Sequence, residues 1–149
     1  MNTNRSMNQI LLKNQTFVEV SVQERDVAAK NKPAERFFDV DKFNKLTGGY
    51  DKIQEELLGA FLEFTPVLLE ELKYIVSSNN ASDAARILHK LKSSTSLLCT
   101  NVLYAEIIHL EETSNTIHGS EYKDRIVKLI ASHEVLMDEA RAMQKILSS

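Results

Sequence analysis

The chain has 149 residues, of which 43% are hydrophobic and 26% are charged, and its formal net charge at pH 7 is −3. This composition is typical of a soluble globular domain, and the acidic balance provides no overall positive field that could hold nucleic acid. Only four Gly and two Pro occur, which disfavours a turn-rich β fold and favours long helices. We therefore expect a single all-α domain that binds no nucleic acid.

Cysteine content and the length of the apolar runs bear on the compartment. The single cysteine, Cys99, cannot form an internal disulfide, which favours a reducing environment. The apolar stretch at residues 10–12 is too short for the core of a signal peptide, and no run reaches the roughly 20 residues that span a membrane. We expect a cytoplasmic protein with no membrane segment.

Residues 1–36 differ in composition from the rest of the chain. They are rich in Asn, Gln, Lys and Ser and sustain no helical period. Residues 16–22 alternate as a strand does, but no second strand candidate follows with which they could pair. We expect a flexible N-terminal tail or linker that closes near Pro33. The alternative is an edge strand that pairs with a partner or with a second copy.

From residue 37 onward, apolar residues recur every three or four positions, which is the spacing of amphipathic helices. The pattern and its capping residues predict helices over 39–46, 51–77, 83–98, 102–117 and 121–147. Long helices joined by short polar turns favour an antiparallel up-down packing. We therefore expect residues 37–149 to form a four-helix bundle, with the short extra N-terminal helix lying across one end.

Individual residues within these helices carry further expectations. Pro66 should bend the helix at 51–77, because proline has no N–H for the preceding turn. Ser82 or Asp83 should cap the next helix, and Thr100 or Asn101 the one after it. The predicted inward residues of the helix at 51–77 are Ile53, Leu57, Ala60, Phe61, Phe64, Leu68, Leu72 and Ile75. Those of the helix at 83–98 are Ala84, Ile87, Leu88, Leu91 and Leu98.

One histidine falls on the polar side of the predicted helix at 83–98. At about 100° per residue, His89 lies roughly 140° from the apolar stripe, so its imidazole should face solvent. Small and basic residues stand within about two turns of it, namely Ala85, Arg86, Lys90, Lys92, Ser93 and Ser96. An exposed neutral imidazole is a competent nucleophile, since its free pKa is about 6.5. Nearby Lys and Arg can neutralise a phosphoryl group carried on it.

The segment His89-Lys90-Leu91-Lys92-Ser93-Ser94 resembles the signature of histidine-containing phosphotransfer (HPt) domains, in which His is followed by x-Leu-Lys-Gly and small residues. The resemblance covers about residues 37–118, while the last helix matches only in character. Similar features also stand at residues 43–49, 61–66, 79–80 and 110–112. Ser93 replaces the usual Gly. Serine is the next smallest polar residue, so access to the ring should survive, and its hydroxyl could bond the phosphoryl group or the imidazole.

The resemblance implies a phosphoryl carrier in a two-component relay. His89 would be the phospho-acceptor and Lys92 would stabilise the phosphoryl group. The partners would be response-regulator receiver domains and a hybrid sensor histidine kinase. The receiver would bring the metal and the catalytic acids, so the module needs no cofactor or metal of its own. The candidate partner surface is formed by Ala85, Arg86, Lys90, Ser93 and Ser96.

Other readings of the sequence remain open. The chain shows no Gly-rich phosphate loop, so we expect a carrier without autokinase activity rather than an enzyme, and we expect a monomer. The main alternative is a helical adaptor or dimerisation module that carries no phosphoryl group. Glu106 and His109 have the Glu-x-x-His spacing of di-iron bundles, but such a site needs a second pair. His133 receives no predicted role, and Cys99 is expected to be a small packed side chain.

Overall fold

The computed structural model describes residues 36–78, 81–114, 116 and 119–149. These residues form five α-helices: α2 (Val40–Thr47), α3 (Asp51–Ser77), α4 (Ala81–Thr95), α5 (Asn101–Thr113) and α6 (Ser120–Ser148). Within this described part of the chain there is no strand, only one isolated bridge between Phe38 and Cys99. The all-α class is therefore confirmed. The strand-like stretch at residues 16–22 and the Asn79-Asn80 turn lie outside the described residues.

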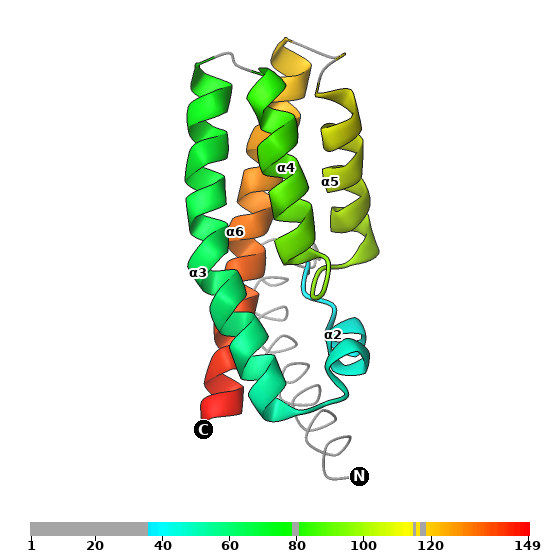
Figure 1. Cartoon of the computed structure of the whole chain (residues 1–149), viewed down its shortest axis with the longest axis vertical. Helices are drawn as coiled ribbons and strands as arrows, with labels where there is room; N and C mark the ends of the chain where they lie inside the picture. The colour runs from blue at the N-terminus through cyan, green and yellow to red at the C-terminus, as the bar shows by residue number, and fades with distance from the viewer. Residues whose placement is uncertain (1–35, 79–80, 115, 117–118) are drawn as a thin grey trace, which may run out of the picture.

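The four long helices lie side by side, and each runs opposite to the one before it in the chain (Figure 1). Packing contacts join α3 to both α4 and α6, and α5 to the same two helices. The short α2 packs against α3, and in Figure 1 it lies below the end of α4 and the start of α5. Figure 1 also shows that α3 changes direction about halfway along its length, as expected of a helix that contains Pro66.

The ends of α2 agree with the sequence prediction to within one residue, and local capping signals set them. The Asp39 carboxylate accepts a hydrogen bond from the Lys42 backbone N–H at 3.0 Å and so caps the first turn of α2. Gly48 ends the helix with φ of 63°, a left-handed conformation that glycine adopts without strain. At α5, the Thr100 hydroxyl accepts from the Leu103 N–H, as expected for a capping residue.

The structure corrects the bounds of the next two helices. α4 begins at Ala81, so Ser82 and Asp83 lie inside its first turn and the predicted capping position was wrong. It ends at Thr95, three residues early, because backbone groups beyond it pair with the chain before α2. The Asp39 N–H donates to the Leu98 carbonyl and the Thr100 N–H to the Phe37 carbonyl, both at 2.8 Å. Likewise α5 ends at Thr113 rather than near 117.

The connection before α2 is fixed to the last helix as well as to the turn after α4. The Phe37 N–H donates to the Glu139 carboxylate at 2.9 Å, and Arg36 pairs with the same carboxylate at 3.6 Å. Cys99, which forms the isolated bridge with Phe38, is fully buried, and burial raises the pKa of its thiol to about 11. The small packed side chain expected of Cys99 is confirmed.

The core prediction holds for α4 and fails in part for α3. Ala84, Ile87, Leu88 and Leu91 are fully buried. In α3, the predicted residues Phe61, Leu68, Leu72 and Ile75 are buried and Leu57 is partly buried. In contrast, Phe64 is 58% exposed and Ile53 is 43% exposed, and Ala60 is exposed too, so these three assignments were wrong.

The error at α3 has a physical reason. The helix carries two stripes with the same spacing, and polar residues interrupt the inner one, where Gln54 and Thr65 are fully buried. The outer stripe is apolar but exposed, and consists of Ile53, Ala60, Phe64, Val67 and Tyr74. Because hydrophobic spacing cannot rank two parallel stripes, the sequence alone assigned some outer residues to the core.

Candidate functional site

His89 lies near the middle of α4, on the side that faces away from the core. Its side chain is 63% exposed, while Leu88 and Leu91 on either side of it are fully buried. The three residues therefore fix the rotation of α4, because turning the helix to hide the imidazole would expose two leucines. The predicted exposure of His89 is confirmed.

A carboxylate from the neighbouring helix holds the imidazole. Glu111 of α5 has one oxygen, Oε2, 2.9 Å from Nδ1 of His89, and its other oxygen, Oε1, 2.8 Å from Nζ of Lys92. Buried Leu110 precedes Glu111 and packs inward, which directs the carboxylate to the edge of the α4–α5 interface. The three side chains form a compact group that is partly open to solvent.

The charges of this group stabilise one another. Burial acts to raise the pKa of Glu111, but hydrogen bonds from Lys92 and then His89 outweigh it, so the pKa lies below the usual value. The hydrogen bond with Glu111 also raises the pKa of Lys92, against a smaller effect of desolvation. Glu111 is therefore ionised and Lys92 protonated at neutral pH.

The carboxylate also selects the tautomer of the imidazole. An ionised carboxylate only accepts hydrogen bonds, so Nδ1 of a neutral His89 must carry the proton that it donates to Glu111. The lone pair then resides on Nε2, for which the described residues provide no hydrogen-bond partner. Anchored at one nitrogen and open at the other, the ring presents a nucleophile of fixed orientation.

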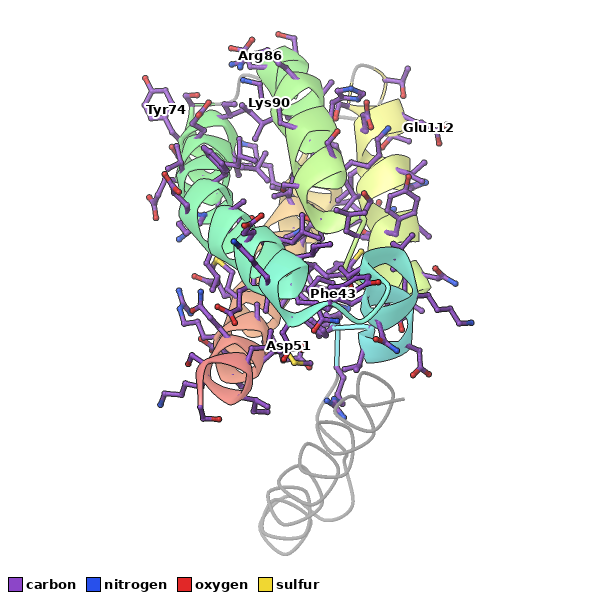
Figure 2. All side chains as sticks on the ribbon, turned by 60° about the horizontal axis from the view of Figure 1, so that its bottom comes forward. Phe43, Asp51, Tyr74, Arg86, Lys90 and Glu112 are labelled. Carbon is purple, nitrogen blue, oxygen red and sulfur yellow. The ribbon has the colours of Figure 1, made fainter. Side chains whose placement is uncertain are left out.

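The residues predicted to form the partner surface lie on α4, apart from Ser96. Arg86 and Lys90 are exposed on it (Figure 2), and Ala85 is half-buried. Ser93 is exposed, one turn after His89, and its hydroxyl donates to the His89 carbonyl at 3.3 Å rather than to the imidazole. Ser96 follows the end of α4, and its hydroxyl donates to the Ser93 carbonyl at 3.4 Å.

The sequence did not assign a role to Glu111. It appeared only within residues 110–112 of the family-like features, because a helical wheel of α4 says nothing of side chains that α5 contributes. The signal that could have found it is its place directly after buried Leu110, on the helix that follows α4.

A second histidine is fully buried between α4 and α6. The Nδ1 of His133 donates to the Leu129 carbonyl at 2.9 Å, so its Nε2 accepts from the Thr95 hydroxyl at 3.3 Å. Burial lowers the pKa of His133 to about 4. The sequence offered a sign of this position, since His133 stands three or four residues from Leu129, Ile130, Leu136 and Met137.

Glu106, the acidic residue of the Glu-x-x-His pair in α5, forms an ion pair with α6. Both oxygens of Glu106 accept from the Arg125 guanidinium of α6, at 3.0 and 2.7 Å. Over the described residues, no group of three or more His, Cys, Asp or Glu side chains is placed to hold a metal ion. His109 is exposed on the surface of α5.

Two further findings concern the whole of the described chain. None of its helices combines the length and the apolar character that crossing a membrane requires. In comparisons with known proteins, no family model matches the chain. No curated protein and no solved structure matches it either.

Proposed function

We propose that this chain is a phosphoryl carrier of the HPt type, which accepts a phosphoryl group on His89 from a receiver-domain phospho-aspartate and passes it to another receiver in a cytoplasmic phosphorelay. One observation carries the proposal. An exposed imidazole is held at Nδ1 by Glu111, and small and basic residues stand within about two turns of it in the sequence. The resemblance of residues 89–94 to the HPt signature points to the same chemistry.

The transfer step needs little equipment on this chain. The Nε2 lone pair attacks phosphorus, the bond between phosphorus and the aspartate oxygen breaks, and its electron pair stays on the aspartate carboxylate. Lys92, whose Nζ lies beside the ring on Glu111, is within reach of the arriving phosphoryl oxygens, and Arg86 adds charge. Positioning and electrostatics supply most of the catalysis in such transfers, and a receiver would contribute the metal ion and the catalytic acids.

The fold suits this role if the helices act as a fixed scaffold. We propose that α3–α6 form an antiparallel up-down four-helix bundle, with α2 across one end. A site on packed helices keeps its geometry when a partner docks. The small residues Ala85 and Ser93, one turn before and after His89, leave room for that partner. The bundle is proposed to act as a monomer and to be a carrier rather than an enzyme.

The test is the intact mass of the protein after incubation with a small phosphoramidate donor at neutral pH. Wild type should gain one acid-labile phosphoryl group, and His89→Gln should gain none. The matched control is His109→Gln, which removes another exposed histidine and should leave the adduct unchanged. Circular dichroism should show that all three proteins are folded, because both histidines are on the surface.

The opposite result would favour the adaptor reading. If folded wild type gains no phosphoryl group from the phosphoramidate or from a phosphorylated receiver domain, the carrier proposal is wrong. The exposed outer stripe of α3, which includes Phe64, Val67 and Tyr74, is the observation that supports an adaptor.

A further inference from the structure

We propose that Glu111 makes phospho-His89 a short-lived, transfer-ready adduct, because its carboxylate keeps the Nδ1 proton on the phosphorylated ring and opposes the charge of the phosphoryl group. The inference rests on the proposed function and deepens it. Its geometric basis is the hydrogen bond between Glu111 Oε2 and His89 Nδ1, at 2.9 Å, in a carboxylate whose other oxygen is already taken by Lys92.

The protonation of the ring decides how easily the phosphoryl group leaves. Attack by Nε2 gives a ring with phosphorus on Nε2 and hydrogen still on Nδ1, so the ring carries a positive charge. From this form the imidazole departs as a neutral molecule when the N–P bond breaks. If Nδ1 loses its proton first, the ring must depart as an anion, which is a far poorer leaving group.

Glu111 favours the first of these forms. Its ionised carboxylate can only accept, so it bonds the Nδ1 hydrogen of the charged ring but faces a lone pair if that hydrogen is lost. The described structure offers no other partner for Nδ1. The carboxylate also lies one ring width from the phosphoryl oxygens, where like charges repel. Both effects weaken the N–P bond relative to a neutral neighbour.

Lys92 limits the repulsion between Glu111 and the phosphoryl group, but it leaves the hydrogen bond from Nδ1 to Glu111 in place. Its ammonium is 2.8 Å from Oε1 of Glu111, so it can turn toward the phosphoryl oxygens when they arrive. Once it does so, its positive charge offsets part of the repulsion between Glu111 and the phosphoryl group, while the hydrogen bond from Nδ1 to Glu111 remains. The group of three is therefore arranged to accept the phosphoryl group and to release it readily.

Glutamine at this position separates charge from hydrogen bonding. The Glu111→Gln amide is of the same size, and it can accept from an Nδ1–H or donate to an Nδ1 lone pair. It should therefore stabilise the neutral phosphorylated ring, which releases the group slowly. The matched control is Glu112→Gln, which removes one carboxylate from the same helix on the side away from α4 (Figure 2).

The decisive measurement is the lifetime of the adduct. Each protein is phosphorylated with the phosphoramidate, freed from the donor, and followed by intact mass in neutral buffer, where water attacks phosphorus and restores the neutral imidazole. We expect Glu111→Gln to lengthen the half-life by about threefold to tenfold, the usual range for the loss of a charged hydrogen bond at a partly exposed site. Glu112→Gln should change the half-life far less, because Glu112 acts on this group of side chains only weakly and through the charge of Lys92. An equal or shorter half-life in Glu111→Gln would overturn the inference and leave the carrier proposal standing.

A second test, nitrogen NMR of the His89 imidazole, does not depend on phosphorylation. Wild type should show the proton of the neutral ring on Nδ1, because an ionised carboxylate only accepts, whereas Glu111→Ala should show a mixture of tautomers. A proton on Nε2 in wild type would overturn the role of Glu111 directly. If wild type forms no adduct, the carrier proposal fails and the lifetime inference falls with it.

Discussion

The proposed role of Lys92 rests on its place in the sequence and on its ion pair in the structure. The sequence places its positive charge about one turn from the imidazole, and in the structure its ammonium is bound to Glu111. The positive charge of Lys92 is thus paired with the Glu111 carboxylate in the resting protein. A phosphoryl group, with more negative charge and more acceptor oxygens than one carboxylate, should draw it away.

Substitution of Lys92 tests this directly. We expect Lys92→Ala to slow phosphorylation of His89 by the phosphoramidate about tenfold, less than the loss of a fully desolvated donor would cost, because the site is open to screening. Lys92→Arg should retain most of the rate. The measurement is the initial rate of adduct formation by intact mass, with Lys90→Ala as a control at an exposed lysine of the same helix. Equal effects of Lys90→Ala and Lys92→Ala would mean that Lys92 contributes only general positive charge and has no specific role at the phosphoryl group.

Helices α3 and α4 show how much of the range and the buried face of a helix local sequence patterns can predict. The α4 stripe of Ala84, Ile87, Leu88 and Leu91 has no competitor, so its inward face and the exposure of His89 followed from sequence alone. The range of α3 was also predictable, because glycines and a polar turn bound it. Which of its two stripes is buried was not, since the choice depends on α4 and α6 packing against it.

The two phenylalanines of α3 provide a paired test of that correction. Phe61 is 2% exposed in the core, so Phe61→Ala should lower the free energy of unfolding by about 3 to 5 kcal/mol. Phe64 is 58% exposed, and Phe64→Ala should cost less than about 1 kcal/mol. Urea denaturation followed by circular dichroism measures both. Similar losses in the two variants would mean that the outer stripe is covered in solution.

At the scale of the whole molecule, side chains that join helices distant in sequence were beyond prediction. Glu111 reaches His89 across 22 positions, and Thr95 reaches His133 across 38. Both contacts depend on which helices become neighbours and at what height, which hydrophobic spacing does not specify. One places a carboxylate beside an exposed imidazole, and the other joins a buried imidazole to a hydroxyl. The same residue type therefore serves two opposite purposes in one fold.

Burial of His133 should make the stability of the molecule depend on pH. Its pKa is about 4 in the folded chain, against about 6.5 when unfolded, so between these values the unfolded chain binds more protons. The free energy of unfolding should therefore fall as pH drops through this window, by up to about 3 kcal/mol at its acid end. The contribution is complete above the unfolded value.

His133→Gln should isolate this effect from the carboxylates that titrate nearby. Glu139 works in the other direction, since burial raises the pKa of its carboxyl, and it is present in both proteins. The variant should be less stable than wild type at neutral pH, because the bonds to Thr95 and the Leu129 carbonyl are disturbed, but the difference should shrink as pH falls. Urea denaturation across the window measures the two slopes. Parallel slopes would mean that His133 gains a proton without unfolding, and that the contact between α4 and α6 opens to water more readily than its burial implies.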